Sequence, residues 1–277
     1  MFIYLQLLKE SFNFAIKSLR DNKLRTFLSL LGVSVGIFSI ISVLSAVDSL
    51  NRNIQDNLSG LDKNMMTISK FSFAPTDVPR WQRLRYPQVT YQEYEFLVKE
   101  VSNIDAATYI IFGVISPIKY GGKTINSVMA DAATFEIQQV QDIIVEKGRF
   151  MNESESRSGA PIIVLGHEIA QQLFGDEDPI GKEVRYFGKQ LTVSGVLKKY
   201  GSMSDVDGKV ILLSTFVRNF MNTGPQGMPS GITIKPKKGI DIAEFENTLI
   251  QSLRRIRGLK PDDPNNFFIN KMSSFTD

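Results

Sequence analysis

The hydrophobic pattern of the chain is dominated by residues 27–47, FLSLLGVSVGIFSIISVLSAV, which contain no charged residue over twenty-one positions. As an α-helix this stretch is about 30 Å long, which matches the hydrocarbon core of a bilayer. A cleaved signal peptide has a shorter apolar region behind a short basic head, and soluble proteins rarely bury an uncharged run of this length. The pattern therefore predicts a transmembrane helix over residues 27–47.

Apolar and polar positions also alternate with helical spacing on both sides of the predicted span. Residues 1–26 carry apolar side chains every three or four positions, which predicts an amphipathic helix in the cytoplasmic interface; a plain leader without a partner fits the same pattern. Beyond the span the helical pattern continues over residues 48–61 and predicts a stalk. Gly32 and Gly36 lie one turn apart, a spacing that admits a neighbouring helix but also arises by chance in apolar segments.

Residues 62–277 alternate between short apolar strands and amphipathic helices. Strands are expected at 65–71, 107–119, 124–130, 161–166, 184–187, 190–197, 210–213, 231–236 and 267–270, and helices at 90–101, 167–174, 214–221 (capped) and 240–257. Thr90 and Glu93 are expected to form a capping box at the start of the first of these helices. Residues 72–89 are expected to form a loop and residues 133–159 an irregular segment. This order predicts an α+β sandwich made of residues 62–134 and 228–277, interrupted by a smaller inserted domain at residues 135–227.

Charge sets the expected orientation in the membrane. Arg20, Lys23 and Arg25 crowd the edge that precedes the span, whereas the residues after it show no basic excess. The positive-inside rule then places the N-terminus in the cytoplasm and the main domain outside. These three cations are expected to anchor the helix at the membrane edge through anionic lipid, each by about 1 kcal/mol.

Composition and motifs argue against an enzyme. The chain has 277 residues, a net charge of +3 and no cysteine, so disulfides, iron–sulfur clusters and thiolate zinc sites are excluded and no nucleic-acid partner is expected. The GGKT sequence at 121–124 ends like a phosphate-binding loop, but Pro117 stands where that motif requires glycine, so a hairpin turn is expected. His167 is the only histidine and has no catalytic or metal-binding companions in the sequence. We expect no catalytic, cofactor or metal site in this chain.

Two stretches resemble a known family. Residues 18–43, SLRDNKLRTFLSLLGVSVGIFSIISV, resemble the first transmembrane segment of MacB/FtsX-type ABC transporter permeases, also called the type VII ABC superfamily. Residues 173–199, LFGDEDPIGKEVRYFGKQLTVSGVLKK, resemble their extracytoplasmic core domain, and GRF at 148–150 and VLG at 164–166 precede them at the expected offsets. The resemblance covers nearly the whole chain.

The resemblance implies a non-catalytic permease subunit of the bacterial inner membrane. Its periplasmic part would have a porter-like subdomain interrupted by a Sabre-like one, which agrees with the predicted insertion. The implied partners are a cytoplasmic ABC ATPase, which binds ATP and Mg²⁺, a second permease copy in a homodimer or related heterodimer, membrane lipid, and a periplasmic adaptor protein as a further candidate. Such a subunit transmits ATP-driven motion across the membrane, for efflux or for substrate handling outside.

The sequence departs from the family pattern at both ends. It carries no N-terminal ATPase domain, so the ATPase is expected on a separate polypeptide, and it ends at Asp277, where family members continue into three further spans. The chain is therefore expected to be the N-terminal part of a permease. The alternative function is a single-span receptor or sensor whose outer domain binds a ligand or peptide.

Overall fold

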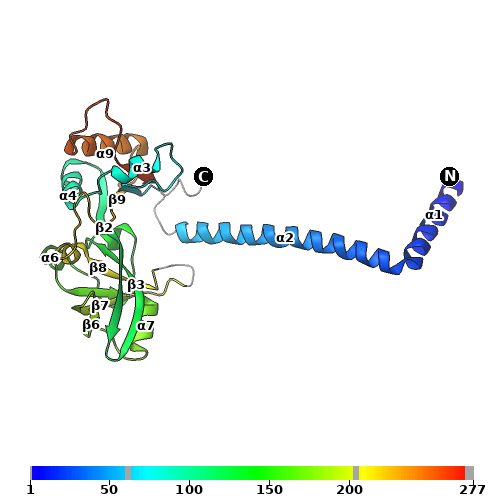
Figure 1. Cartoon of the computed structure of the whole chain (residues 1–277), viewed down its shortest axis with the longest axis horizontal. Helices are drawn as coiled ribbons and strands as arrows, with labels where there is room; N and C mark the ends of the chain where they lie inside the picture. Colours follow the sequence, from blue (N-terminus) through cyan, green and yellow to red (C-terminus); the bar gives the residue numbers. More distant parts are fainter. Residues whose placement is uncertain (1, 60–63, 202–205, 272–277) are drawn as a thin grey trace. The chain divides into compact units, whose positions relative to one another are not determined.

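The computed structural model describes residues 2–59, 64–201 and 206–271 (Figure 1). The chain divides into two units, residues 1–55 and 56–277, and each is described by itself. The predicted end of the stalk at residues 60–61 lies outside the described residues.

The first unit is helical. Helix α1 (Phe2–Asp21) is separated by Asn22 from α2 (Lys23–Ser59), which continues through 37 residues without interruption. The predicted span and the described part of the predicted stalk therefore form one helix. Its large apolar side chains are exposed, such as Phe38 at 72%, so the helix does not bury them within its own chain.

The second unit is built on one mixed sheet. In the part of the chain that the structure describes, ten strands form it: β1 (Met66–Ser69), β2 (Ile104–Tyr120), β3 (Lys123–Ala133), β4 (Val145–Gly148), β5 (Ile162–Leu165), β6 (Glu183–Tyr186), β7 (Lys189–Leu197), β8 (Lys209–Leu213), β9 (Ser230–Pro236) and β10 (Phe268–Lys271). Their order is β10-β1-β9-β2-β3-β8-β5-β7-β4, and β6 pairs with β2 and β7. The β3–β8 and β5–β7 pairs are parallel and the others are antiparallel.

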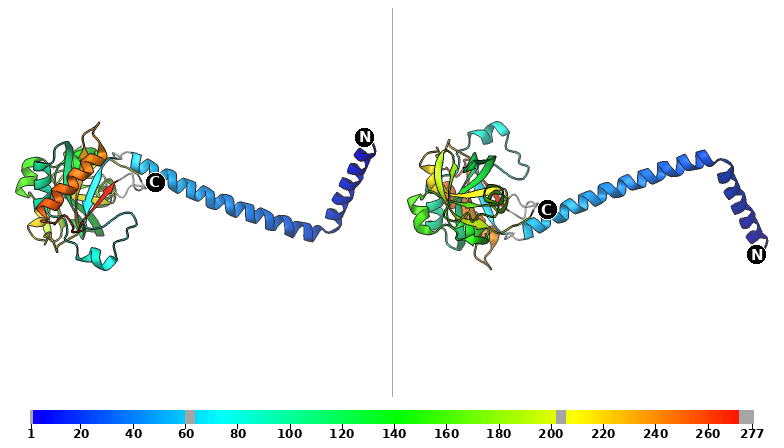
Figure 2. Two further views of the ribbon diagram at one scale, coloured as in Figure 1. Left: turned by 90° about the horizontal axis from the view of Figure 1, so that it is seen from above. Right: turned by 90° about the horizontal axis from the view of Figure 1, so that it is seen from below.

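Helices cover this sheet and bury its apolar side chains. They are α3 (Arg80–Arg85), α4 (Tyr91–Glu100), α5 (Ile137–Val140), α6 (Glu153–Ser158), α7 (His167–Phe174), α8 (Ser214–Arg218) and α9 (Ile242–Ile256). Figure 2 shows α9, in orange, lying across the strands. Leu97 of α4 and Leu249 of α9 pack in the same core as Ile232 of β9. The observed mixture of helix and sheet confirms the predicted α+β class.

Strand β2 connects the two predicted parts of this unit. Residues 104–111 pair with β9, whereas Ile118 and Lys119 pair with β6, and an irregularity in the β2–β3 register lies between Ile111 and Val114. The Tyr186 hydroxyl donates to the Val128 carbonyl oxygen at 2.8 Å and lies 3.2 Å from the carbonyl oxygen of Val114, which follows this irregularity. Both parts share one sheet, and the separate inserted domain at residues 135–227 stays a prediction.

Three local expectations need correction. The segment at 133–159 is not irregular, since it contains α5, β4 and α6; α6 begins with a capping box between Asn152 and Glu155. The loop at 72–89 contains the short helix α3. The helix at 214–221 ends at Arg218 and has no side-chain cap, because Leu213 holds the cap position and the buried Ser214 hydroxyl has no hydrogen-bond partner among the described residues.

Candidate functional site

The first candidate site is the apolar part of α2. Among the described residues, one helix is long and apolar enough to cross a membrane, and it covers Lys23–Leu50, 28 residues. An exposed apolar surface of this length is unfavourable in water and favourable in hydrocarbon. The structure therefore supplies a helix of the length that the sequence predicts for a span.

The predicted anchoring cations lie together at the junction of α1 and α2. Arg20 is in the last turn of α1, Lys23 is the first residue of α2, and Arg25 follows in its first turn. All three side chains are exposed, so they are free to reach lipid head groups. Their anchoring role stays a prediction.

The predicted packing glycines lie one turn apart within α2. A Cβ atom added to Gly32 or to Gly36 would meet no atom within 4 Å. That face of α2 is thus open along the two glycines, as a close helix–helix contact requires. A second helix against these glycines stays a prediction.

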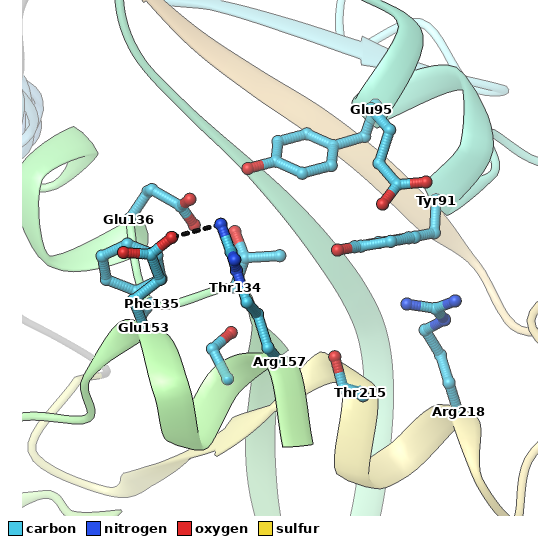
Figure 3. A pocket seen from close by; sticks show the side chains of 11 residues that line it. Tyr91, Glu95, Thr134, Phe135, Glu136, Glu153, Arg157, Thr215 and Arg218 are labelled. Carbon is cyan, nitrogen blue, oxygen red and sulfur yellow. Dashed lines mark ion pairs between the residues drawn. The ribbon is translucent and has the colours of Figure 1, made fainter. Parts of the chain in front are cut away.

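The second candidate site is a pocket of about 470 Å³ in the sheet-based unit, which the sequence did not indicate (Figure 3). Its lining is polar and aromatic and comes from α4, α6, α8 and the segment before α5: Tyr91, Tyr94, Glu95, Thr134, Phe135, Glu136, Glu153, Ser156, Arg157, Thr215 and Arg218. Figure 3 shows Glu136, Glu153 and Arg157 at one end, and Glu95, Tyr91 and Arg218 at the other.

The charges in this pocket are unequally paired. The Arg157 guanidinium lies 2.5 Å from the Glu153 carboxylate, and the Arg218 guanidinium lies 3.7 Å from the centre of the Tyr91 ring. Oxygen Oε2 of Glu136 is buried and has no hydrogen-bond partner among the described residues. Glu136 therefore has a partly buried charge without a matching cation, whereas Glu95, which also has no ion pair among the described residues, is exposed to solvent.

The pKa values of the pocket tyrosines, Tyr91 and Tyr94, are shifted by burial and by the neighbouring charges. Burial raises the pKa of Tyr94, and the charge of Glu136 raises it further. Burial likewise raises the pKa of Tyr91, with a contribution from Glu95 that Arg218 opposes. Both hydroxyls therefore stay protonated at neutral pH, and the Tyr94 hydroxyl donates to the Ala107 carbonyl oxygen at 3.4 Å.

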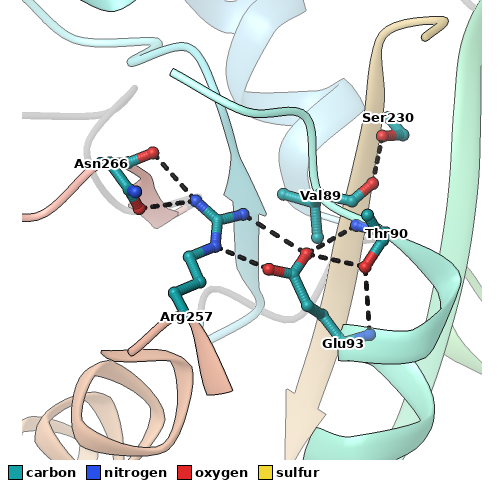
Figure 4. A network of polar contacts seen from close by, with 6 residues as sticks. All are labelled: Val89, Thr90, Glu93, Ser230, Arg257 and Asn266. Carbon is teal, nitrogen blue, oxygen red and sulfur yellow. Dashed lines mark hydrogen bonds and ion pairs between the residues drawn. The ribbon is translucent and has the colours of Figure 1, made fainter. Parts of the chain in front are cut away.

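A buried polar network holds the helix that carries these tyrosines (Figure 4). The predicted capping box is confirmed: the Thr90 side chain accepts from the Glu93 amide, and the Glu93 carboxylate accepts from the Thr90 amide at 2.6 Å. The same carboxylate lies 2.6 Å from Nε of Arg257, which follows α9 and also donates to Asn266 at 2.8 Å. The start of α4 is thereby fixed to the end of α9.

The remaining motifs are structural. Residues 121–124 form the turn between β2 and β3 and the start of β3, as predicted, rather than the start of a helix. His167 begins α7, and its Nδ1 lies 3.4 Å from a carboxylate oxygen of Glu146. Among the described residues no group of three or more histidine, aspartate or glutamate side chains is placed to hold a metal ion.

Comparison with known proteins gives consistent matches. The family model for the MacB-like periplasmic core domain matches residues 26–252. The macrolide export ATP-binding/permease protein MacB of Neisseria meningitidis serogroup A is 25% identical over 271 residues, which cover 96% of this chain and 39% of that protein. MacB of Chlorobaculum tepidum is 24% identical over 268 residues, which cover 94% of this chain and 40% of that protein. The chain thus spans about two-fifths of the length of these relatives.

Solved structures share the fold. The periplasmic region of MacB from Actinobacillus actinomycetemcomitans has a TM-score of 0.63 and 20% identity, and the match covers 80% of this chain and 95% of that one. The extracellular domain of the transporter YknZ from Gram-positive bacteria has a TM-score of 0.59 and 16% identity, and the match covers 74% of this chain and 98% of that one.

The family match extends from the span through most of the sheet-based unit and agrees with the resemblance seen in the sequence. It favours a permease over a single-span receptor. The chain belongs to the MacB-like periplasmic core domain family, that of the MacB/FtsX-type ABC transporter permeases.

Proposed function

We propose that residues 1–277 form the first span, the stalk and the extracytoplasmic domain of a permease that transmits ATP-driven motion across the bacterial inner membrane. The N-terminus is cytoplasmic and the sheet-based unit lies outside, where motion serves efflux or substrate handling. The observation that carries this proposal is the continuity of α2 over Lys23–Ser59, from the predicted span into the stalk.

The mechanical argument follows from helix geometry. At about 1.5 Å per residue, α2 is roughly 55 Å long, whereas the hydrocarbon core takes about 30 Å. About 25 Å of the same helix therefore lies outside the hydrocarbon, and residues 48–59 supply about 18 Å of it on the stalk side. Because an uninterrupted helix bends only gently, a displacement at its cytoplasmic end is passed to the stalk without a ligand travelling through the chain.

The partners of such a subunit follow from its place in a transporter. An ABC ATPase binds ATP and Mg²⁺ and supplies the motion, so residues 1–277 take no catalytic part in hydrolysis. A second permease copy packs against the span, and lipid head groups contact Arg20, Lys23 and Arg25. A periplasmic adaptor is a further partner to test. The relatives from Neisseria meningitidis and Chlorobaculum tepidum are ATP-binding/permease proteins, which supports the pairing with an ATPase.

The stiffness of α2 is tested by two insertions of equal length after Leu50, Gly-Gly-Gly and Ala-Ala-Ala. Each insertion adds three residues, so both change the position of the residues after Leu50 by the same helical rotation and rise. They differ in stiffness, because glycine lowers helix stability by about 1 kcal/mol per residue relative to alanine. A spin label on Asp176→Cys in each copy of the complete permease, purified with its ATPase, reports the distance between the two outer units. Residues 1–277 contain no cysteine, so the label is unique once any cysteines elsewhere in the permease and its ATPase have been replaced.

We expect an ATP-dependent change in the label-to-label distance that the alanine insertion retains and the glycine insertion abolishes, with ATP hydrolysis continuing in both variants. An unchanged response with the glycine insertion would show that α2 does not carry the motion. No stimulation of ATP hydrolysis by the complete permease in membranes would count against the transporter assignment itself.

A further inference from the structure

The pocket described above carries an inference beyond permease function. Its lining contains three carboxylates, of Glu95, Glu136 and Glu153, and two guanidinium groups, of Arg157 and Arg218. The lining therefore has a formal charge of −1, three negative groups against two positive ones.

The excess negative charge that is shielded from solvent belongs to Glu136, because Glu95 is exposed. Arg157 is paired with Glu153 on α6, and Arg218 lies on the ring of Tyr91. Oxygen Oε2 of Glu136 is buried and accepts no hydrogen bond from the described residues. A buried carboxylate oxygen without a donor is costly, and a cationic donor is the group that offsets this cost best.

The surroundings of Glu136 suit an organic cation better than a bare ion. Phe135 and Tyr94 line the pocket beside it, and aromatic rings attract ammonium and guanidinium groups. The volume of about 470 Å³ is within the usual range of small-molecule sites. Metal binding lacks support, because no three candidate ligand side chains converge in the described part of the chain.

An anion fits this pocket less well. Both guanidinium groups already have partners, so an anionic ligand would have to displace Glu153 from Arg157 or the Tyr91 ring from Arg218. It would also be repelled by the uncompensated carboxylate of Glu136.

We propose that this pocket binds a small organic cation, a molecule with a primary ammonium or guanidinium group that donates hydrogen bonds to the Glu136 carboxylate. The lining combines residues from 62–134, such as Tyr94, with residues from 135–227, such as Arg157. A bound cation therefore links the two predicted parts of the outer unit. The proposal does not depend on transport, because the whole site lies within the sheet-based unit.

The test is binding of 4-fluorobenzylamine to the full chain in nanodiscs of phosphatidylcholine, followed by the ¹⁹F transverse relaxation of the ligand at pH 7. The neutral control ligand is 4-fluorobenzyl alcohol, which has the same shape without the charge. We expect the amine to bind at least tenfold more tightly than the alcohol, the order expected for a charged hydrogen bond. Equal binding of the two would overturn the proposal.

Three variants test whether Glu136 is the residue that binds the organic cation. Glu136→Gln keeps the shape of the side chain and should weaken amine binding about tenfold, whereas Glu183→Gln, an exposed carboxylate on β6, should leave it unchanged. Arg157→Gln removes a positive charge that repels the ligand and should tighten binding several-fold, a direction that mere loss of structure cannot produce. Wild-type affinity in Glu136→Gln, or weaker binding in Arg157→Gln, would exclude Glu136 as the cation site.

Discussion

The strongest consequence at the scale of single residues concerns Glu93 and Arg257. Their side chains are 10% and 6% exposed, and the carboxylate joins the cap of α4 to the end of α9. Glu93→Gln leaves the Arg257 cation buried without its counter-charge. We expect the free energy of unfolding to fall by about 3 kcal/mol, as measured by urea denaturation of the chain in detergent.

The same two helices supply a matched control. Glu100 of α4 lies 3.0 Å from Arg255 of α9, but their side chains are 40% and 62% exposed. Because solvent screens this pair, Glu100→Gln should cost less than about 1 kcal/mol. Equal losses in the two variants would show that burial of the Glu93–Arg257 pair does not matter.

The sequence predicted part of this arrangement. Thr90 and Glu93 are three positions apart, so their capping box could be predicted from local spacing. The contact with Arg257 joins residues 164 positions apart, and no local pattern indicates it. The pocket was missed for the same reason, since its residues come from segments that only the folded sheet brings together.

At the scale of elements, the open glycine face of α2 is the feature to test. Replacing Gly32 and Gly36 with leucine fills the space that a neighbouring helix would occupy. We expect disulfide crosslinking between two copies carrying Ile40→Cys to fall several-fold in membranes that contain the complete permease. Ile40 lies one turn beyond Gly36, on the same face.

The control is the double replacement of Val33 and Ile37 with leucine, one position further along the helix and about 100° around it. Crosslinking should be retained in this variant. If the glycine variant crosslinked as efficiently as the control, the glycines would have no part in the contact between copies.

Elements differed in how well the sequence predicted them. The span, α4, α7, α9 and the β2–β3 and β6–β7 hairpins have clear periodicity, caps or glycine turns and were predicted with small boundary errors. Helix α5 and strand β4 have four residues each, too few for a period to be visible. Helix α6 was missed although Asn152 and Glu155 form a capping box. The need for glycine at position 148 was not predicted either. An added Cβ there would lie 2.4 Å from the Ser194 carbonyl oxygen, and this contact between distant residues is not visible in the sequence.

At the scale of the whole molecule, the account depends on which side of the membrane each unit occupies. The family match indicates an extracytoplasmic sheet-based unit, and the apolar part of α2 is long enough to cross a membrane. The proposed cytoplasmic N-terminus depends on the cations before the predicted span. The permease proposal requires this orientation, since motion driven by ATP begins in the cytoplasm. The absence of cysteine from the sequence allows each side to be labelled separately.

The most direct measurement uses Lys9→Cys in α1 and Asp176→Cys after α7, both at exposed positions. A membrane-impermeant maleimide is added to intact spheroplasts and, in a parallel sample, to lysed ones. We expect Asp176→Cys to react in both samples and Lys9→Cys to react only after lysis. Reaction of Lys9→Cys in intact spheroplasts, or protection of Asp176→Cys until lysis, would contradict the account.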